Sequence, residues 1–213
     1  KGSGEIAYTY KPKKFGKVYV SGGDNYDLIN NYESLQSVIS RSNYVQKIHG
    51  GIGHKMELFN GFYLDASLEY QDQRPITGLE LAPWSEELFG SGNTPTDFDR
   101  YRQTLVDVKI QYVIGQKYYT EPYKKIILGS KYPKLKLHYR KGIPGIFNSD
   151  VDFDFLEVSL SQEVQLGTFG TSKFNVYTGK FLNDNSLRFI EQKWFRGSDK
   201  WWYSDPLRSF QLL

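Results

Sequence analysis

The 213-residue chain contains no cysteine, which excludes a disulfide framework and any metal site built on thiolates. It has no unbroken apolar run of the ~20 residues that a membrane-spanning helix needs. Its charges nearly balance, with 27 Lys and Arg residues against 24 Asp and Glu residues, so composition demands no polyanionic partner. Its first residues include no hydrophobic signal segment. We infer that such a segment was removed or that Lys1 is not the native N-terminus.

Common catalytic and binding motifs are also missing. The sequence has no phosphate-binding loop, no Gly-x-Gly-x-x-Gly after a predicted strand and no Gly-x-Ser-x-Gly nucleophile elbow. The three histidines, His49, His54 and His138, are too dispersed for a zinc motif. We therefore expect a non-enzymatic protein with no catalytic residue, no metal site and no cofactor.

What the chain does have is aromatic and alternating sequence. Aromatic residues make up 16% of it, led by 17 tyrosines, a composition typical of β-structure. From Met56 to Gln71 the even positions are apolar at all but Asn60, and the odd positions carry every charge. A period of two indicates a strand with one apolar and one polar face. Asn60-Gly61 is a hairpin signal, but the alternation continues through it, so we predict one long strand.

The same alternation predicts strands over 104–114, 134–140 and 156–166. Shorter candidates lie near 5–10, 15–21, 124–128, 173–182, 187–195 and 208–213, with glycine and proline clusters between the strands. Residues 32–49 fit a helix or a strand equally well, and residues 76–100 form the longest predicted loop. Nothing in the sequence divides the chain into domains.

These strands are longer than the ~5–6 residues of ordinary strands and suit the ~9–11 residues that cross a membrane in a barrel. We predict an all-β fold, an antiparallel transmembrane β-barrel. Alternation alone does not say which face meets lipid, so a soluble β-sandwich or closed β-barrel that binds glycan or lipid is the alternative. In the membrane interpretation the lipid-facing residues are Leu58, Phe62, Leu64, Leu68, Val106, Val108, Ile110, Val158 and Leu160. The residues facing a polar lumen are Asp65, Glu69, Asp107, Lys109, Glu157 and Glu163.

Two segments combine aromatic rings with polar or basic groups. Residues 117–141 interleave lysines with tyrosines, which suits single-stranded nucleic acid, a solvated loop or a membrane rim. We favour the membrane rim and expect no nucleic-acid partner. The tail segment 191–206 gathers tryptophans that suit an interfacial turn, a sugar-stacking platform or a soluble core. The candidates for contact with lipid head groups are Lys117, Tyr118, Tyr119, Lys124, Lys125, Trp194, Trp201 and Trp202.

Asp150, Asp152 and Asp154 occupy alternate positions, as carboxylates on one face of a strand would. A calcium loop starting at Asp150 would need Gly at its sixth position and Glu at its twelfth, and the chain has Phe155 and Ser161 there. We interpret the three aspartates as the aqueous side at the start of a strand. On this interpretation Phe153 and Phe155 start the apolar wall.

Several longer stretches, in this order and spacing, point to a known family: "YTYKPKKFGKVYVSGG" (8–23), "MELFNGFYLDASLEYQDQRPI" (56–76), "IGQKYYTEPYKKIILGSKYPKLKLHYRKGI" (114–143), "SDVDFDFLEVSLSQ" (149–162) and "SFQLL" (209–213). Together they resemble a Bacteroidetes outer-membrane β-barrel family. Its members often carry a carboxypeptidase-regulatory-like domain ahead of the barrel, which is distantly similar to the barrels of outer-membrane assembly and surface-antigen proteins. One departure is Trp194-Phe195-Arg196-Gly197-Ser198, where that family tends to show His-Phe-x-Gly-Asn.

The resemblance implies an integral protein of the bacterial outer membrane, with residues 1–213 as a barrel portion incomplete at both ends. The implied roles are envelope transport, surface display, or a subunit of an outer-membrane assembly or secretion complex. The expected partners are the lipid bilayer, through lipopolysaccharide or phospholipid, and other outer-membrane proteins. The resemblance supplies no catalytic residues.

Overall fold

The computed structural model describes residues 1–28, 44–76, 97–193, 196–197 and 209–210. Strands dominate this part of the chain, joined by turns and short 3-10 helices. The first elements are β1 (Gly2–Lys11), η1 (Pro12–Lys14), β2 (Gly16–Leu28), β3 (Tyr44–Phe59), β4 (Phe62–Pro75), β5 (Tyr101–Val113), β6 (Lys117–Thr120) and β7 (Lys125–Gly129). They are followed by β8 (Lys134–Gly142), η4 (Ile146–Asn148), β9 (Asp152–Gln165), η5 (Gly167–Phe169), β10 (Thr171–Ser186), η6 (Phe189–Glu191), β11 (Arg196–Gly197) and β12 (Ser209–Phe210). Among these residues no helix has the length and hydropathy to cross a membrane.

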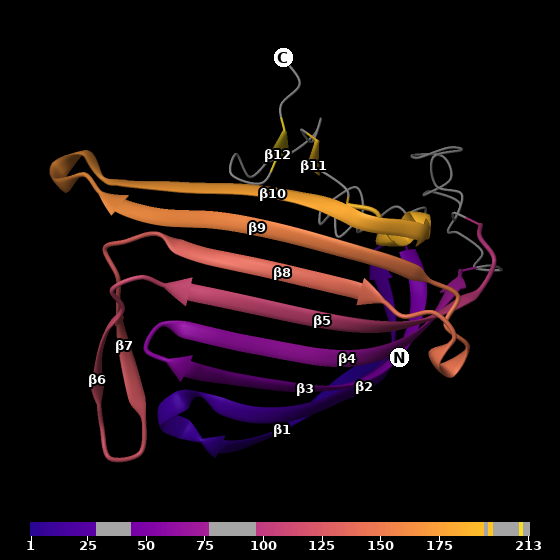
Figure 1. The fold of residues 1–213 in the computed structure, drawn as a ribbon, viewed down its shortest axis with the longest axis horizontal. Coiled ribbons are helices and arrows are strands. Elements are labelled where there is room, and N and C mark those ends of the chain that lie inside the picture. The colour runs from indigo at the N-terminus through magenta and orange to yellow at the C-terminus, as the bar shows by residue number, and fades with distance from the viewer. Residues whose placement is uncertain (29–43, 77–96, 194–195, 198–208, 211–213) are drawn as a thin grey trace, which may run out of the picture.

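Eight of the strands form one curved antiparallel sheet in the order β1-β2-β3-β4-β5-β8-β9-β10 (Figure 1). The small sheet β6-β7 is a separate hairpin inserted between β5 and β8. Within the described residues β1 and β10 each pair on one side only, so the large sheet is open. The predicted all-β antiparallel fold is confirmed, and closure into a barrel is not shown.

Most of the predicted strands are present, including those within β1, β2, β5, β7, β8, β9 and β10. The strand predicted over 187–195 is wrong for its described residues, which form η6 and irregular chain instead. Of residues 32–49, those from 44 onward lie in β3. The remainder of that segment, and most of the predicted loop 76–100, lie outside the described residues.

The single long strand predicted over Met56–Gln71 is wrong, because the chain reverses at Asn60-Gly61 to form the β3–β4 hairpin. Gly61 takes a φ of 82°, a conformation that glycine adopts readily, and a Cβ there would lie 2.4 Å from the Val113 carbonyl oxygen. The alternation survives the reversal because of a bulge. Phe59 pairs with Phe62, but the register shifts at Leu58, so that Met56 pairs with Leu64. Even positions therefore stay on one face in both strands.

Cross-strand pairing divides the sheet into two faces. On the inner face, the registers align charged and polar residues such as Asp65, Lys109 and His138 across β4, β5 and β8. On the outer face, they align apolar residues such as Leu64, Ile110 and Leu137 across the same strands. Antiparallel strands with strict alternation produce this separation directly.

The two ends of the sheet differ in their connections. At one end, which we call the turn end, β1 joins β2 through η1 and β3 joins β4 through Asn60-Gly61. At the other, the loop end, β2 is separated from β3 by residues 29–43 and β4 from β5 by residues 76–100. In Figure 1 the turn end is at the left, where the β6–β7 hairpin also lies.

The buried apolar core lies on the inner face at the loop end. Its buried members are Tyr101, Leu105, Val151, Phe153 and Phe155, and partly buried Phe98, Phe181, Leu187 and Ile190 pack against them. Leu187 and Ile190 follow β10, so the chain after that strand folds back over the inner face. The inner face is thus apolar and filled at the loop end, and polar toward the turn end.

Candidate functional site

The outer face carries an apolar band that crosses all eight strands. Unlike a soluble core, much of it is exposed: Ile6 is 83% exposed, Val176 63% and Ile52 52%. Soluble monomers rarely expose a contiguous apolar surface of this extent. On β4 the band runs from Phe62 to Tyr70, about 26 Å at ~3.3 Å per residue, or about 20 Å of height at a barrel's usual tilt.

The structure places the predicted lipid-facing residues on this face with one exception. Cross-strand pairs join Leu64 with Ile110, Ala66 with Val108 and Leu68 with Val106. Phe62, Val158 and Leu160 belong to the same face by their registers. Leu58 instead lies in the bulge of β3, where Phe59 takes the position opposite Phe62.

Aromatic side chains flank the band at both ends. At the turn end, Phe59 stacks on Phe62 with ring centroids 4.7 Å apart, and Tyr112 lies 6.1 Å from each of them. Tyr10, near the end of β1 that leads into η1, stacks on His54. At the loop end, Tyr70 meets Phe147 edge-on at 6.0 Å. Two aromatic rows around an apolar band are the surface pattern of membrane barrels.

The loop η4 holds Phe147 on the outer face. Phe147 has a φ of 51° and is 68% exposed, an unusual combination for a bulky residue. Thr104 helps to fix the loop to β5, because its hydroxyl donates to the Ile146 carbonyl (2.9 Å) and its amide to the Ser149 hydroxyl (3.1 Å). No alternation in the sequence indicates this exposed aromatic, because it lies in a turn between two strands.

Beyond the loop-end aromatic row, the outer face becomes charged. Asp72 accepts hydrogen bonds from Arg100 and Arg74, each at 2.6 Å from a guanidinium nitrogen. Burial disfavours the Asp72 carboxylate, but these hydrogen bonds outweigh it and lower its pKa to about 2. The same hydrogen bond raises the pKa of Arg100. A row of paired charges therefore marks the end of the apolar band.

The Asp72 network predicts a pH-dependent contribution to stability. Because the folded pKa is about 2 and the ordinary value 3.8, its contribution is complete above pH ~4 and is lost as the pH falls toward 2. We expect Asp72→Asn to lower the free energy of unfolding by about 2 kcal/mol at pH 7, with the difference vanishing near pH 2. Urea unfolding of the full-length protein in lipid vesicles measures this. Glu163→Gln, at an exposed pair with Lys173, is the control and should change little at any pH.

The three alternate aspartates lie differently from our prediction. Asp154 shares the outer face with Leu156 and Val158, whereas Phe153 and Phe155 belong to the buried inner core. The predicted faces of the aspartates and the phenylalanines are therefore wrong. The alternation between the two faces runs unbroken along β9, so that even-numbered residues from Asp152 onward share the outer face. The carboxylates of these aspartates lie on the outer face, just beyond the end of the apolar band.

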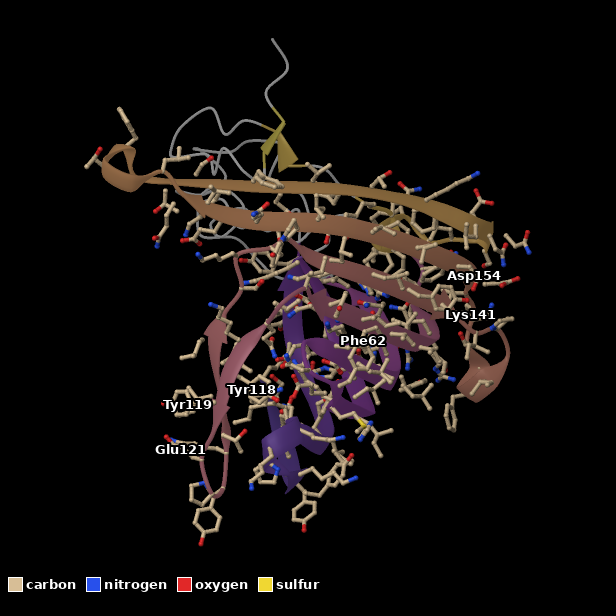
Figure 2. The ribbon with its side chains drawn as sticks, turned by 60° about the vertical axis from the view of Figure 1, so that its left-hand side comes forward. Phe62, Tyr118, Tyr119, Glu121, Lys141 and Asp154 are labelled. Atoms are coloured by element: carbon tan, nitrogen blue, oxygen red, sulfur yellow. The ribbon has the colours of Figure 1, made fainter. Side chains whose placement is uncertain are left out.

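Each of these aspartates has partners. Asp154 pairs with Lys141 at 2.8 Å, as the right of Figure 2 shows. Asp154 also accepts a hydrogen bond from the Tyr139 hydroxyl. Asp152 accepts from the side-chain amides of Asn183 and Asn185, at 2.8 and 3.2 Å. Asp150 accepts from the Arg102 amide at 3.0 Å. No group of His, Cys, Asp or Glu side chains suited to a metal ion occurs among the described residues.

The inner face brings together the residues predicted to line a lumen. Asp65 and Lys109 are paired across β4 and β5, and Glu157 lies opposite His138 on β8. Asp107 accepts from His138 at 2.8 Å and pairs with Lys109 at 3.0 Å. Glu69 and Glu163 lie on the same face. In the register of the sheet, Glu69 is opposite Leu105 and Glu163 is opposite Lys173. The registers therefore put these residues on one face of the sheet, and their position in a lumen stays a prediction.

The β6–β7 hairpin is anchored to the inner face through a buried ion pair. The Lys125 ammonium lies 2.6 Å from both carboxylate oxygens of Glu57, and the two side chains are 7% and 3% exposed. Gln116 and the Gly61 amide also donate to Glu57, at 3.0 and 2.9 Å. The prediction that Lys125 contacts head groups is therefore wrong, because its ammonium is enclosed between Glu57 and the Tyr118 ring, 4.0 Å from the ring centroid.

The remaining head-group candidates on this hairpin are exposed. Tyr118 and Tyr119 are close to half exposed, and Lys124 pairs with neighbouring Glu121 at 3.3 Å. Figure 2 shows Tyr118, Tyr119 and Glu121 along the hairpin, away from the loop-end pair Lys141 and Asp154. Lys117 begins β6 and is exposed as well. Trp194, Trp201 and Trp202 lie outside the described residues.

The β6–β7 hairpin is one segment that packs on the inner face, and the chain after β10 is another, at the loop end. After β10, Glu191 pairs with Arg140 at 2.9 Å and accepts a hydrogen bond from Gln103 at 2.7 Å. Lys193 pairs with Glu157 at 2.6 Å. The sequence around residues 187–193 has no local pattern that indicates these distant partners.

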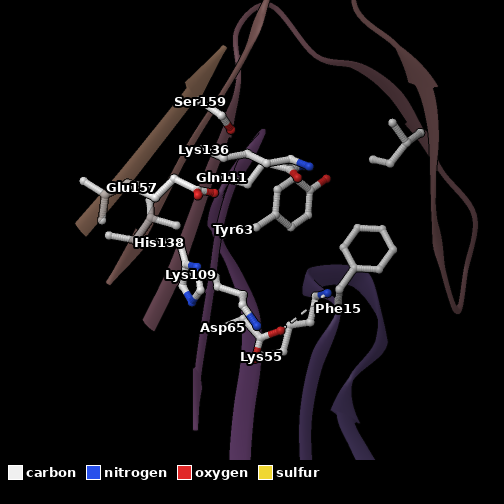
Figure 3. Close-up of a pocket in the computed structure, with 13 residues that line it drawn as sticks. Phe15, Lys55, Tyr63, Asp65, Lys109, Gln111, Lys136, His138, Glu157 and Ser159 are labelled. Carbon is white, nitrogen blue, oxygen red and sulfur yellow. Dashed lines mark ion pairs between the residues drawn. The ribbon is translucent and has the colours of Figure 1, made fainter. Parts of the chain in front are cut away.

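The inner face forms an open cavity of about 530 Å³, which the β6–β7 hairpin borders through Ile127 (Figure 3). Its walls combine charged residues of β3, β4, β5, β8 and β9 with apolar residues, among them Phe15 from the β1–β2 turn and Ile127 from β7. A cavity of this size, with polar groups that converge from five neighbouring strands, can hold a small organic molecule.

Comparison with known protein families gives one match. The C-terminal domain of a family of unknown function (DUF5686) matches residues 1–213. The chain belongs to this family. No curated protein and no solved structure matches the chain. The family description gives neither a location nor an activity, so the resemblance to the Bacteroidetes outer-membrane barrels, and to members with a preceding regulatory-like domain, stays a prediction.

Proposed function

We propose that this chain forms the wall of a non-enzymatic β-barrel in the bacterial outer membrane. Its role there is envelope transport, surface display, or membership of an outer-membrane assembly or secretion complex. The observation that carries the proposal is the outer face, on which an exposed apolar band lies between two aromatic rows while the lumen-type charges lie on the inner face. In lipid this arrangement is favourable, because the bilayer covers the apolar band and its interfaces accommodate the aromatic rows.

The connections support an orientation. Outer-membrane barrels have short periplasmic turns and longer extracellular loops. By this rule the turn end, with Asn60-Gly61 and η1, faces the periplasm, and the loop end faces outward. The β6–β7 hairpin then lies on the periplasmic side, where its exposed lysines and tyrosines are placed to contact phospholipid head groups or another envelope protein.

A bilayer also requires that the sheet edges be paired, because an unpaired backbone group in hydrocarbon costs several kcal/mol. In the proposed barrel, β1 and β10 are joined to one another or to strands outside the described residues. The soluble alternative would need its apolar face turned inward. The exposure of residues such as Ile6 and Val176 on the outer face weighs against it.

The proposal predicts heat-modifiable migration of the full-length protein. Extracted from the outer-membrane fraction with detergent, it should migrate faster in gel electrophoresis before boiling than after, because a closed barrel resists unfolding by the detergent. Matched unboiled and boiled samples provide the comparison. Recovery of the protein in the soluble periplasmic fraction, with a single band in both lanes, would refute membrane insertion.

A further inference from the structure

The cavity on the inner face has an uneven distribution of charge. Most of its charged groups are compensated: Lys55 pairs with Asp65 at 3.8 Å, Lys109 with Asp107 at 3.0 Å, and Glu157 with Lys193 at 2.6 Å. Asp65 additionally accepts from the Tyr19 hydroxyl at 2.9 Å, and Asp107 from His138 at 2.8 Å. These contacts involve every carboxylate in the cavity wall.

Lys136 is the exception in the cavity wall. Among the described residues its ammonium has no ion pair, hydrogen bond or ring contact. Its cross-strand neighbours are neutral, Gln111 on β5 and Ser159 on β9, and both also line the cavity. Figure 3 shows Lys136 and Gln111 extending toward Tyr63. Lys136 is solvent-exposed at this wall, and its direct cross-strand neighbours are neutral groups that can hydrogen-bond.

The opposite side of the cavity is apolar. Phe15, in the left-handed conformation at φ 51°, lies with its ring 6.0 Å from that of Tyr63. Ile127 of β7 lines the cavity near them, and the Lys125–Glu57 ion pair fixes the hairpin that carries it. An aromatic wall facing a single cation suits a ligand that has both a planar or apolar ring and an anionic group.

We propose that this cavity binds a small ring compound that carries a phosphate or carboxylate group. Lys136 is the counter-ion of the anionic group, with Gln111 and Ser159 as additional hydrogen-bond donors. Phe15 and Tyr63 form the surface on which the ring packs. The inference goes beyond the proposed function, because neither membrane insertion nor a role in an envelope complex requires a ligand at this place.

The experiment uses the full-length protein in detergent, with phenyl phosphate, inorganic phosphate and phenol as probes in isothermal titration calorimetry. We expect phenyl phosphate to bind more tightly than either inorganic phosphate or phenol. Lys136→Gln should weaken phenyl phosphate binding about tenfold, as expected from the loss of one charge-assisted hydrogen bond. Phe15→Leu should weaken phenyl phosphate but leave inorganic phosphate unchanged.

Lys134→Gln is the matched control, because Lys134 lies on the same strand and the same face but outside the cavity wall. It should bind phenyl phosphate as the natural protein does. Equal binding by Lys136→Gln and Lys134→Gln would overturn the proposal, and so would the absence of phenyl phosphate binding. Heat-modifiable migration of each variant confirms that it is folded, so that a failure to bind is distinguished from a failure of the barrel itself.

Discussion

Replacing Lys125 with methionine is expected to lower the free energy of unfolding by ~3–5 kcal/mol, the usual effect of removing one partner from a buried ion pair. Methionine has a similar length and packs well, but it leaves the Glu57 carboxylate buried without its cation. Glu57 is 2% exposed and would retain only the Gln116 and Gly61 donors. The measurement is urea unfolding of the full-length protein in lipid vesicles, followed by tryptophan fluorescence.

Two controls separate the buried charge from the general effect of substitution. Lys124→Met changes the adjacent lysine, which is 63% exposed and pairs with Glu121, so its effect should stay within ~1 kcal/mol. Adding Glu57→Gln to Lys125→Met removes both charges and should restore much of the lost stability. Equal effects of Lys124→Met and Lys125→Met would contradict the buried ion pair.

Replacing Leu68 with lysine is expected to cost ~2–4 kcal/mol, because position 68 lies within the apolar band of the outer face and the proposal places that band in the bilayer. Replacing the neighbouring Ser67 with lysine should be nearly neutral. Ser67 points to the polar inner face, where it is paired with Asp107. Unfolding of both variants from lipid vesicles gives the comparison between adjacent residues on opposite faces.

The loss of stability caused by a lysine on the outer face should also depend on how deep in the bilayer the lysine lies. Phe62→Lys lies at the turn-end aromatic row, where a lysine reaches the interface, so its charge should cost only ~0–1 kcal/mol beyond the loss of the ring contacts. Equal costs at positions 67 and 68 would argue that the outer face does not meet lipid. A soluble protein with the same sheet would show no dependence on depth.

Much of the fold was predictable because alternation is a local signal. The division of β5 into Val106, Val108 and Ile110 on one face and Asp107 and Lys109 on the other follows from a period of two, and the registers agree with it. The β3–β4 hairpin escaped the same reasoning for a specific reason. A two-residue turn pairs an odd with an even position, but the bulge at Leu58 restores the parity, so the reversal leaves no break in the pattern.

The candidate site was less predictable because its decisive contacts are distant in sequence. Nothing near Lys125 indicates that it pairs with Glu57 on another strand, and its basic neighbours suggested an exposed surface instead. Lys136 has the same alternating sequence context as Lys134, yet Lys136 lines the cavity and Lys134 does not. The prediction for the aspartates at 150–154 was wrong for a different reason. Strict alternation along β9 puts Asp154 on the same face as Leu156, but we assigned these residues to the opposite face because their side chains are polar.

The most direct test of the central claim is a scan of single cysteines along residues 104–111 of β5 in the full-length protein in lipid bilayers. The chain has no cysteine, so each spin label reports on one position without background from these 213 residues. Collision rates with oxygen, which concentrates in lipid, are compared with those of a water-soluble nickel complex. We predict that Val106, Val108 and Ile110 favour oxygen, while Asp107 and Lys109 favour the nickel complex. Equal access of the nickel complex to both sets would contradict a lipid-facing outer surface.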